Sequence, residues 1–390
     1  MSRFHSYLST ANKLISTYKS GTPLTHHLKT FFSLDKKYGS RDRKMIGAIC
    51  YHYFRCANLF KQNHSTNNCI IYSTFLCEFG ENEFLKNISP ELYERINLST
   101  VEKLNYLKVN VDDFFAYTNE ISDKIDKSKF ALSFFQQPSL FLRIRPKKKV
   151  AVIDSLQKAK IAYELIGDNC LKFKNGLSLE NQLRINRDVV VQDLNSQKVF
   201  DCLKEEEILP ANQTAISVWD CCAASGGKSI LLNDTLNGKI KLTVSDLREN
   251  ILANLKIRLR EAGINIQKKF VQDLSVASGL SPDEKFSIVI CDAPCTGSGT
   301  WGRTPEQYFS FNKSSILNFT EKQQSILKNV IPHIEKNGLL IYITCSVLKA
   351  ENEDMVKTIK DKFKLKVLEM NYLKGYESQA DTMFVAVLRS

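Results

Sequence analysis

From Asp188 onward the sequence alternates between short apolar runs and helical patterns, and this alternation limits the fold more than any other feature. Runs of this length, rich in β-branched residues, are typical of strands buried on both faces. We expect strands at Ile216–Asp220, Leu242–Ser245, Lys269–Val271, Phe286–Cys291, Gly338–Thr344 and Met383–Arg389. Strands that alternate with helices predict a mostly parallel sheet with crossover helices, and therefore an α/β fold.

Two of these strands lead directly to a cysteine. Phe286–Cys291 is followed by Asp292 and, three residues later, Cys295, whereas Gly338–Thr344 is followed at once by Cys345. Open α/β sheets bind their ligands just beyond the carboxyl ends of the strands. We therefore predict that a carboxylate and two thiols meet a substrate at this edge of the sheet.

The loop after the first strand, Cys222–Lys228, is made of small residues before a lysine. Such residues let the backbone approach a ligand closely and point helix N–H groups at an anion. Asp246 ends the next strand, where a carboxylate accepts hydrogen bonds from ribose hydroxyls, and Asp273 could receive an adenine amine or simply cap its loop. The pattern indicates an adenosine-containing cofactor, while the absence of GxGxxG and GxxxxGK[ST] counts against NAD and nucleoside triphosphates.

Thiols at strand ends suggest covalent chemistry on a poorly reactive carbon. A thiolate that adds to carbon 6 of a cytosine makes carbon 5 nucleophilic enough to attack an electrophilic methyl group. Asp292 could hydrogen-bond the base, the second thiol could help to remove the carbon 5 proton, and Lys228 could lower a thiol pKa or orient the aspartate. Either cysteine alone would be read as a small buried hydrophobe, but the two together with Asp292 favour a site.

The composition limits the partners. The first sixty residues carry 10 basic and 2 acidic side chains, which suggests a nucleic-acid partner, although solvated basic helices would look the same. The chain lacks the roughly 20-residue apolar run that spans a bilayer and the apolar core of a signal peptide. Eleven cysteines without a CxxC pair argue for free thiols and against zinc. We expect a cytoplasmic monomer with no metal and no membrane contact.

The chain divides by pattern into three predicted domains: residues 1–130, which are helical; residues 131–188, a small α/β module; and residues 189–390, the α/β sheet. In the first, a helix opens at Ser40 as its N-cap. The small module carries Arg143, Arg145 and a lysine run, which could form a phosphate-contacting ridge or a solvated strand edge.

Three motifs together resemble the Sun-family RNA 5-methylcytosine methyltransferases: DCCAASGGKS (Asp220–Ser229), DAPCTGSGTWGR (Asp292–Arg303) and ITCSVLKAENEDMV (Ile343–Val356). The resemblance covers about residues 138–390. It implies a Rossmann-like fold with a mostly parallel seven-stranded sheet, and S-adenosylmethionine as the cofactor. Two departures are Ser225, where the family usually has proline, and Thr382-Met383, where it usually has glycine and phenylalanine.

The resemblance also implies roles for individual residues. Cys345 corresponds to the nucleophile, Cys295 to the residue that assists product release, and Asp292 and Lys228 complete the catalytic set. The cofactor-binding residues it implies are Cys222, Ala223, Ala224, Ser225, Gly226, Gly227, Lys228, Asp246, Arg248, Asp273 and Asp292.

The segment KKYGSRDRKMIGAICYHYFR resembles the NusB-like RNA-binding domain of RsmB-type bacterial family members. This implies small-subunit (16S-type) ribosomal RNA as the substrate, with tRNA as an alternative. An amino-methyltransferase acting on an exocyclic nitrogen would need no nucleophilic thiol, so Cys295 and Cys345 argue against it. A non-catalytic RNA-binding assembly factor is the alternative of a different class.

Overall fold

The computed structural model describes residues 2–204 and 215–390, which form two compact units. The first unit contains the described residues up to Gln137 together with Thr300–Lys313, and the second contains Pro138–Gly299 and Ser314–Ser390. The chain thus leaves the second unit directly after Gly299 and returns to it at Ser314. Within the described residues, no helix is both long and apolar enough to cross a membrane.

The first unit is helical. Its α-helices are α1 (Arg3–Ser16), α2 (Leu24–Leu34), α3 (Ser40–Cys56), α4 (Thr66–Cys77), α5 (Glu83–Ile88), α6 (Pro90–Tyr93), α7 (Thr100–Tyr106), α8 (Lys127–Ser133) and α12 (Pro305–Phe309). Ile46, Ile49 and Cys50 form a buried apolar stripe along α3. The predicted N-cap is wrong by one residue: Gly39 is the cap, and its backbone N–H donates to Asp42 Oδ2 at 3.0 Å.

A four-stranded antiparallel sheet opens the second unit, in the order β2-β3-β1-β4. Its elements are β1 (Leu140–Ile144), α9 (Lys149–Lys158), β2 (Glu164–Ile166), β3 (Cys170–Phe173) and β4 (Val189–Val191). Arg143 and Arg145 of this module both form ion pairs with Asp234, at 2.7 and 2.8 Å, and all three side chains are about nine-tenths buried or more. Neither predicted role, a phosphate ridge or a solvated edge, describes these two arginines, because a buried carboxylate binds both.

The seven-stranded sheet has the order β10-β11-β9-β8-β5-β6-β7. Its strands are β5 (Ile216–Asp220), β6 (Ile240–Asp246), β7 (Ile266–Val271), β8 (Phe286–Asp292), β9 (Ile334–Thr344), β10 (Lys366–Leu373) and β11 (Met383–Arg389). The strands β7, β6, β5, β8 and β9 are parallel; β11 runs antiparallel to β9, and β10, antiparallel to β11, runs in the same direction as the five. The predicted α/β fold is confirmed.

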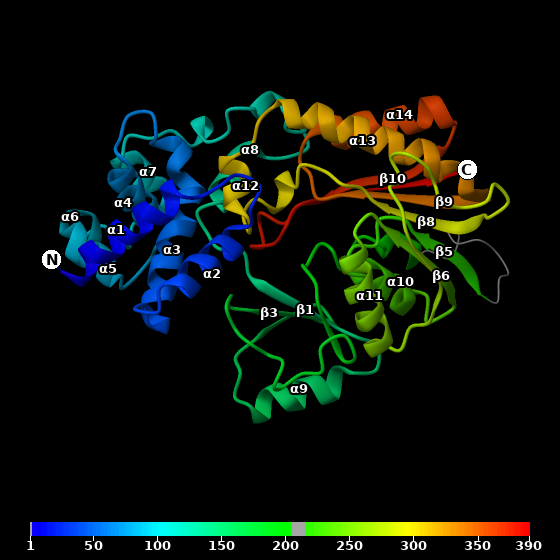
Figure 1. Ribbon diagram of the computed structural model, residues 1–390, viewed down its shortest axis with the longest axis horizontal. Helices are drawn as coiled ribbons and strands as arrows, with labels where there is room; N and C mark the ends of the chain where they lie inside the picture. The colour runs from blue at the N-terminus through cyan, green and yellow to red at the C-terminus, as the bar shows by residue number, and fades with distance from the viewer. Residues whose placement is uncertain (1, 205–214) are drawn as a thin grey trace. The chain divides into compact units, whose positions relative to one another are not determined.

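Helices cover both faces of this sheet (Figure 1). These helices are α10 (Gly227–Thr235), α11 (Glu249–Glu261), α13 (Ser314–Val330) and α14 (Glu353–Phe363). One apolar core joins the sheet to α10 and α11, and the other joins it to α13 and α14. Since both faces are covered, access to the sheet is left at the strand ends, where the loops after β5, β6, β7, β8 and β9 lie.

Candidate active site

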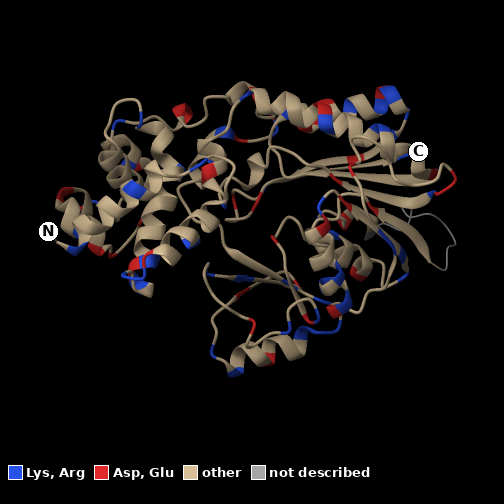
Figure 2. Ribbon diagram, in the orientation of Figure 1, with Lys and Arg blue, Asp and Glu red and all other residues tan. Residues whose placement is uncertain are grey.

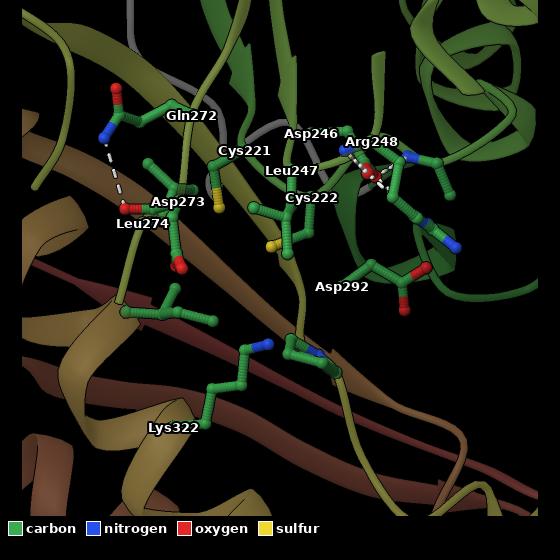
Figure 3. A pocket seen from close by; sticks show the side chains of 13 residues that line it. Cys221, Cys222, Asp246, Leu247, Arg248, Gln272, Asp273, Leu274, Asp292 and Lys322 are labelled. Carbon is green, nitrogen blue, oxygen red and sulfur yellow. Dashed lines mark hydrogen bonds and ion pairs between the residues drawn. The ribbon is translucent and has the colours of Figure 1, made fainter. Parts of the chain in front are cut away.

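A pocket lies at the carboxyl ends of β5, β6, β7 and β8, with α13 on one side (Figure 3). Its lining residues are Cys221, Cys222, Ala224, Asp246, Leu247, Arg248, Gln272, Asp273, Leu274, Asp292, Pro294, Lys322 and Ile326. Six of the predicted site residues therefore line this pocket: Cys222, Ala224, Asp246, Arg248, Asp273 and Asp292. Sequence reasoning missed Lys322, which extends from α13 toward the pocket, because nothing in its helix marks it as different from a surface lysine.

The loop between β5 and α10 has the close backbone approach that its small residues predict. Ala224 and Gly226 both have positive φ angles, 44° and 82°. A Cβ on Gly226 would lie 3.2 Å from Leu255 Cγ, tighter than an ordinary contact, and the positive φ would strain any other residue, so glycine is favoured there. Gly226 thereby lets the loop pack closely against α11 at the start of α10.

Ser225, which departs from the family's proline, is held by hydrogen bonds. Arg258 Nη1 donates to the Ser225 carbonyl oxygen at 2.9 Å and to its Oγ at 2.6 Å. Arg258 Nε donates to Asn186 Oδ1 at 3.0 Å. The family's proline ring would restrict the backbone at this position. Here the Arg258 side chain of α11 holds the loop by hydrogen bonds instead.

Asp246 lies at the end of β6 and faces the pocket. Its Oδ2 accepts from the Ala224 backbone N–H at 3.0 Å, and its Oδ1 accepts from Arg248 Nε at the same distance. Burial would raise the pKa of Asp246, but the hydrogen bonds from Arg248 outweigh it and place the pKa below its usual value. The carboxylate therefore stays charged. Arg248 also donates its backbone N–H to Oδ1 and its Nη2 to Oδ2, so a ligand hydroxyl would take the place of one of the Arg248 hydrogen bonds.

Asp273 both caps its loop and lines the pocket. Its Oδ1 accepts from the Ser275 hydroxyl at 2.5 Å and from the Ser275 backbone N–H at 3.0 Å. These hydrogen bonds lower the pKa of Asp273. Asp273 therefore caps its loop, which is one of the two roles that the sequence left open, and it also lies in the pocket wall.

Lys228 and Asp292 form an ion pair in which Nζ lies 2.5 Å from Oδ2. Burial alone would lower the pKa of Lys228, but the charge of Asp292 and its hydrogen bond raise the pKa instead. Lys228 thus remains an ammonium group, which can orient a carboxylate and offset negative charge but cannot act as a base.

The two cysteines at the ends of β8 and β9 lie side by side, with Cys295 Sγ 3.4 Å from Cys345 Sγ. Both are free thiols. The hydrogen bond and charge of Cys345, together with burial, raise the pKa of Cys295 well above its usual value. Cys295 therefore stays protonated and can donate its S–H to its neighbour.

Sequence reasoning also missed Glu351, whose carboxylate connects the loop after Cys295 to the loop after Cys345. Its carboxylate accepts from the Thr296 backbone N–H at 2.8 Å, the Thr296 hydroxyl at 2.6 Å and the Ser346 hydroxyl at 2.5 Å. The side chain is fully buried, and burial raises its pKa. The clue in the sequence was an acidic residue six positions after Cys345 in an otherwise buried segment.

Gly299 fixes the loop after Cys295 against the start of β11. Its N–H donates to the Cys345 carbonyl at 2.8 Å, and its own carbonyl accepts from the Thr382 N–H at 3.0 Å. A Cβ on Gly299 would lie only 1.9 Å from the Thr382 carbonyl oxygen. The departure at Thr382 from the family pattern is therefore accommodated through backbone atoms, which do not depend on the side chain.

The sheet order, with β11 alone running opposite to the other strands, and the pocket at the carboxyl ends of the parallel strands are those of the S-adenosylmethionine-dependent methyltransferase fold. The residues fit this cofactor, because the small side chains of Cys222 and Ala224 and the charged carboxylates of Asp246 and Asp273 line the pocket. Residues 207–388 match the family described as 16S rRNA methyltransferase RsmB/F. Over these residues, a little under half of the chain, the sequence is similar to the RsmB/F family.

Curated relatives agree with this assignment. The chain is 27% identical over 225 residues to the probable ribosomal RNA small subunit methyltransferase B of Bacillus subtilis, covering 56% of this chain and 48% of the relative. It is 24% identical over 282 residues to the Synechocystis protein of the same name, covering 68% of this chain and 61% of the relative. The chain thus spans about half to three fifths of the length of these relatives.

Solved structures share the fold. PH0851 superposes with a TM-score of 0.70 at 18% identity, covering 99% of this chain and 98% of that one. NSun6 from Pyrococcus horikoshii, solved with SFG, has a TM-score of 0.59 at 14% identity, covering 70% of this chain and 96% of that one. At these identities the likeness establishes the methyltransferase fold alone.

Proposed function

We propose that this protein methylates carbon 5 of a cytosine in RNA, through a covalent adduct between Cys345 and the base. The observation that carries the proposal is the pair of thiols 3.4 Å apart at the carboxyl edge of the sheet. An enzyme that methylates an exocyclic nitrogen needs neither of them. The family roles map Cys345 to the nucleophile, and the raised pKa of Cys295 supports this division because it keeps Cys295 protonated.

In this mechanism the Cys345 thiolate adds to carbon 6 of the cytosine, so that electron density moves to carbon 5. S-adenosylmethionine, when bound, supplies the electrophilic methyl group. Asp292 accepts a hydrogen bond from the exocyclic amine or the protonated ring nitrogen, and Lys228 holds that carboxylate in place at 2.5 Å. Because Cys295 is protonated, the carbon 5 proton passes to solvent water beside this thiol, which assists the step; the Cys345–carbon 6 bond then breaks by β-elimination, which frees the methylated base and returns the Cys345 thiolate.

The cofactor would be held by the three strand ends that line the pocket. Asp246 would accept from the ribose hydroxyls, with Arg248 keeping its carboxylate charged, and Asp273 would receive the adenine amine. The loop Cys222–Lys228 would lie against the methionine portion, where its small residues permit backbone contact.

We further propose that the substrate is small-subunit ribosomal RNA, as the names of the relatives indicate for those proteins. Basic side chains in the first unit support an RNA partner (Figure 2). The exposed basic residues lie in α2, at the start of α3 and in the segment that joins them: Lys29, Lys36, Lys37, Arg41, Arg43 and Lys44. The proposal assigns a NusB-like RNA-binding role to residues 1–130, a connecting role to the module at 131–188 and the catalytic role to residues 189–390. We also propose that the protein is a cytoplasmic monomer.

The covalent step provides the test. With S-adenosylmethionine and small-subunit RNA lacking 5-methylcytosine, Cys295→Ala should accumulate a protein–RNA adduct that survives denaturing electrophoresis, whereas Cys345→Ala should form none. Cys202→Ala, at a free cysteine outside the pocket lining, is the matched control and should behave as the unmodified protein. An adduct in Cys345→Ala and none in Cys295→Ala would reverse the assigned roles.

The product and substrate are tested separately. Bisulfite sequencing of the methylated RNA should show a cytosine resistant to conversion, and a sensitive product would overturn carbon 5 chemistry. Radiolabelled methyl transfer should be faster to ribosomal RNA than to a tRNA pool, and the opposite preference would favour the tRNA alternative. A non-catalytic assembly factor predicts that Cys345→Ala keeps full activity in cells.

A further inference from the structure

Three cysteines that do not belong to one common sequence motif lie close together at the cofactor pocket. Cys221 and Cys222 follow β5 and Cys291 lies in β8, and their three Sγ atoms all lie within 4.8 Å of one another. None of the three is disulfide-bonded. This cluster is separate from the Cys295–Cys345 pair, and the proposed mechanism uses neither Cys221 nor Cys291.

The sheet itself produces the cluster. β5 and β8 are neighbouring parallel strands, with Asp220 in register with Ile290, and the Cys221 N–H donates to the Ile290 carbonyl at 3.0 Å. Cys221 and Cys291 therefore occupy paired positions on the same face of the sheet, where both are fully buried. Cys222, the next residue along, is only partly buried and lines the pocket together with Cys221.

Three converging sulfur atoms suit a thiophilic divalent cation. Zinc–thiolate bonds are about 2.3 Å long, so three sulfurs around one tetrahedral ion lie about 3.8 Å apart. The observed limit of 4.8 Å comes within about 1 Å of that spacing, a difference that side-chain rotation can remove. Zinc sites with three protein ligands keep the fourth position for an exchangeable ligand, and here the side of the cluster that reaches the surface is the pocket.

The charges are consistent with such a site. Each thiol gives up its proton when it binds the cation, so one Zn²⁺ and three thiols yield a complex with one net negative charge and three released protons. Thiolates without a cation would leave three buried negative charges close to the carboxylate of Asp292, which low-dielectric surroundings strongly disfavour. A divalent cation removes most of that charge, whereas Na⁺ or Mg²⁺, which prefer oxygen ligands, would not bind.

We propose that Cys221, Cys222 and Cys291 form a binding site for Zn²⁺ whose fourth position opens into the cofactor pocket, so that Zn²⁺ and S-adenosylmethionine weaken each other's binding. The absence of a CxxC pair argued against zinc from the sequence, but that rule concerns ligands close together in the chain. Here β5 and β8 supply the ligands from positions seventy residues apart.

The full-length protein, reduced and stripped of metal, can be titrated with Co²⁺ as a spectroscopic probe and then with Zn²⁺. We expect one equivalent of Co²⁺ with the visible bands of tetrahedral coordination and a thiolate charge-transfer band, displaced by Zn²⁺. Cys291→Ser and Cys221→Ser should each weaken Zn²⁺ binding at least 10-fold, since even changes to groups around metal ligands cost 10- to 100-fold. Cys291→Ser, at a residue outside the pocket lining, should keep the S-adenosylmethionine site, which provides the check that the protein is folded.

Cys170→Ser and Cys345→Ser are the matched controls, and both should bind Co²⁺ as the unmodified protein does. Absence of tetrahedral Co²⁺ in the unmodified protein would overturn the site. So would binding that persists in Cys291→Ser and Cys221→Ser but is lost in Cys345→Ser, because the cation would then occupy the other thiol pair. A saturating concentration of Zn²⁺ should raise the Kd for S-adenosylmethionine, and an unchanged Kd would refute the predicted antagonism.

Discussion

Arg258 takes the place of a missing proline in the cofactor loop, and its removal should weaken cofactor binding selectively. The change we consider is Arg258→Met, which keeps the length of the side chain and its packing along α11 but removes the guanidinium. The Ser225 carbonyl and hydroxyl would each lose a donor, at 2.9 and 2.6 Å. The loop would then sample conformations other than the one in which its backbone faces the cofactor.

The size of the effect follows from these contacts. A hydrogen bond from a charged donor contributes about 1.5–3 kcal/mol when buried, but Ser225 is exposed, so solvent screening reduces the two bonds to roughly 1–2 kcal/mol in total. At 1.4 kcal/mol per factor of ten, the Kd for S-adenosylmethionine should rise about 5- to 30-fold. Ser225→Ala, which removes only the hydroxyl acceptor, should produce a smaller increase.

Proline at the same position provides a rescue test. Ser225→Pro in the Arg258→Met background should recover about 2- to 5-fold in affinity, because a proline in a compatible position contributes about 0.4–1 kcal/mol by restricting the backbone. Isothermal titration calorimetry measures each Kd, and Arg260→Met, an exposed arginine on the same helix, is the control. The reasoning fails if Arg258→Met binds within two-fold of the unmodified protein, or if Ser225→Pro has the same effect with and without Arg258.

Three further changes test the architecture around the site. Burial raises the pKa of Asp220 to about 7 from 3.8, so the folded state holds a proton that the unfolded state loses, and stability should fall as the pH rises from about 4 to 7. Asp220→Asn removes this loss, which is about 4 kcal/mol; its urea midpoint should exceed that of the unmodified protein at pH 8 but not at pH 4, and parallel pH profiles would contradict the assignment. Asp234→Ala leaves two buried arginines without a carboxylate and should cost about 3–5 kcal/mol of stability; a thermal midpoint within 2 °C of the unmodified protein would show that the ion pairs contribute nothing. Gly299→Ala places a methyl group against the Thr382 carbonyl and should abolish methyl transfer, whereas Gly47→Ala, where the added carbon lies 3.8 Å from its nearest neighbour, should be tolerated; equal activity of the two would refute the close approach.

Much of the fold could be predicted from the sequence because buried parallel strands carry a local signature. The strand Phe286–Cys291 was expected with nearly the bounds of β8, and Met383–Arg389 with the bounds of β11. β10 (Lys366–Leu373) was not identified as a strand, because it lies at the edge of the sheet and several of its residues are only partly buried. An edge strand mixes apolar and polar residues, so its pattern is weaker than that of a central strand.

The candidate site was partly predictable for a similar reason. Cys295 and Cys345 were expected to approach each other because parallel strands end at one edge of a sheet, and their sulfur atoms lie 3.4 Å apart. Their chemical roles, and those of the cofactor-binding residues, remain predictions. For Asp273, the sequence could not decide between a cap and a ligand, and the structure shows that its carboxylate caps the loop while facing the pocket.

What the sequence by itself determined, then, is the set of strands, the small-residue loop and the placement of carboxylates and thiols at strand ends, because each depends on residues close together in the chain. Only the tertiary structure decided which distant side chains share a buried environment. Glu351 beneath the two cysteine loops, Arg258 beside Ser225, and Cys291 beside Cys221 are all brought together by the order of the strands and the helices packed on them. Strand order depends on how the whole sheet buries its two faces, a property that no local pattern encodes.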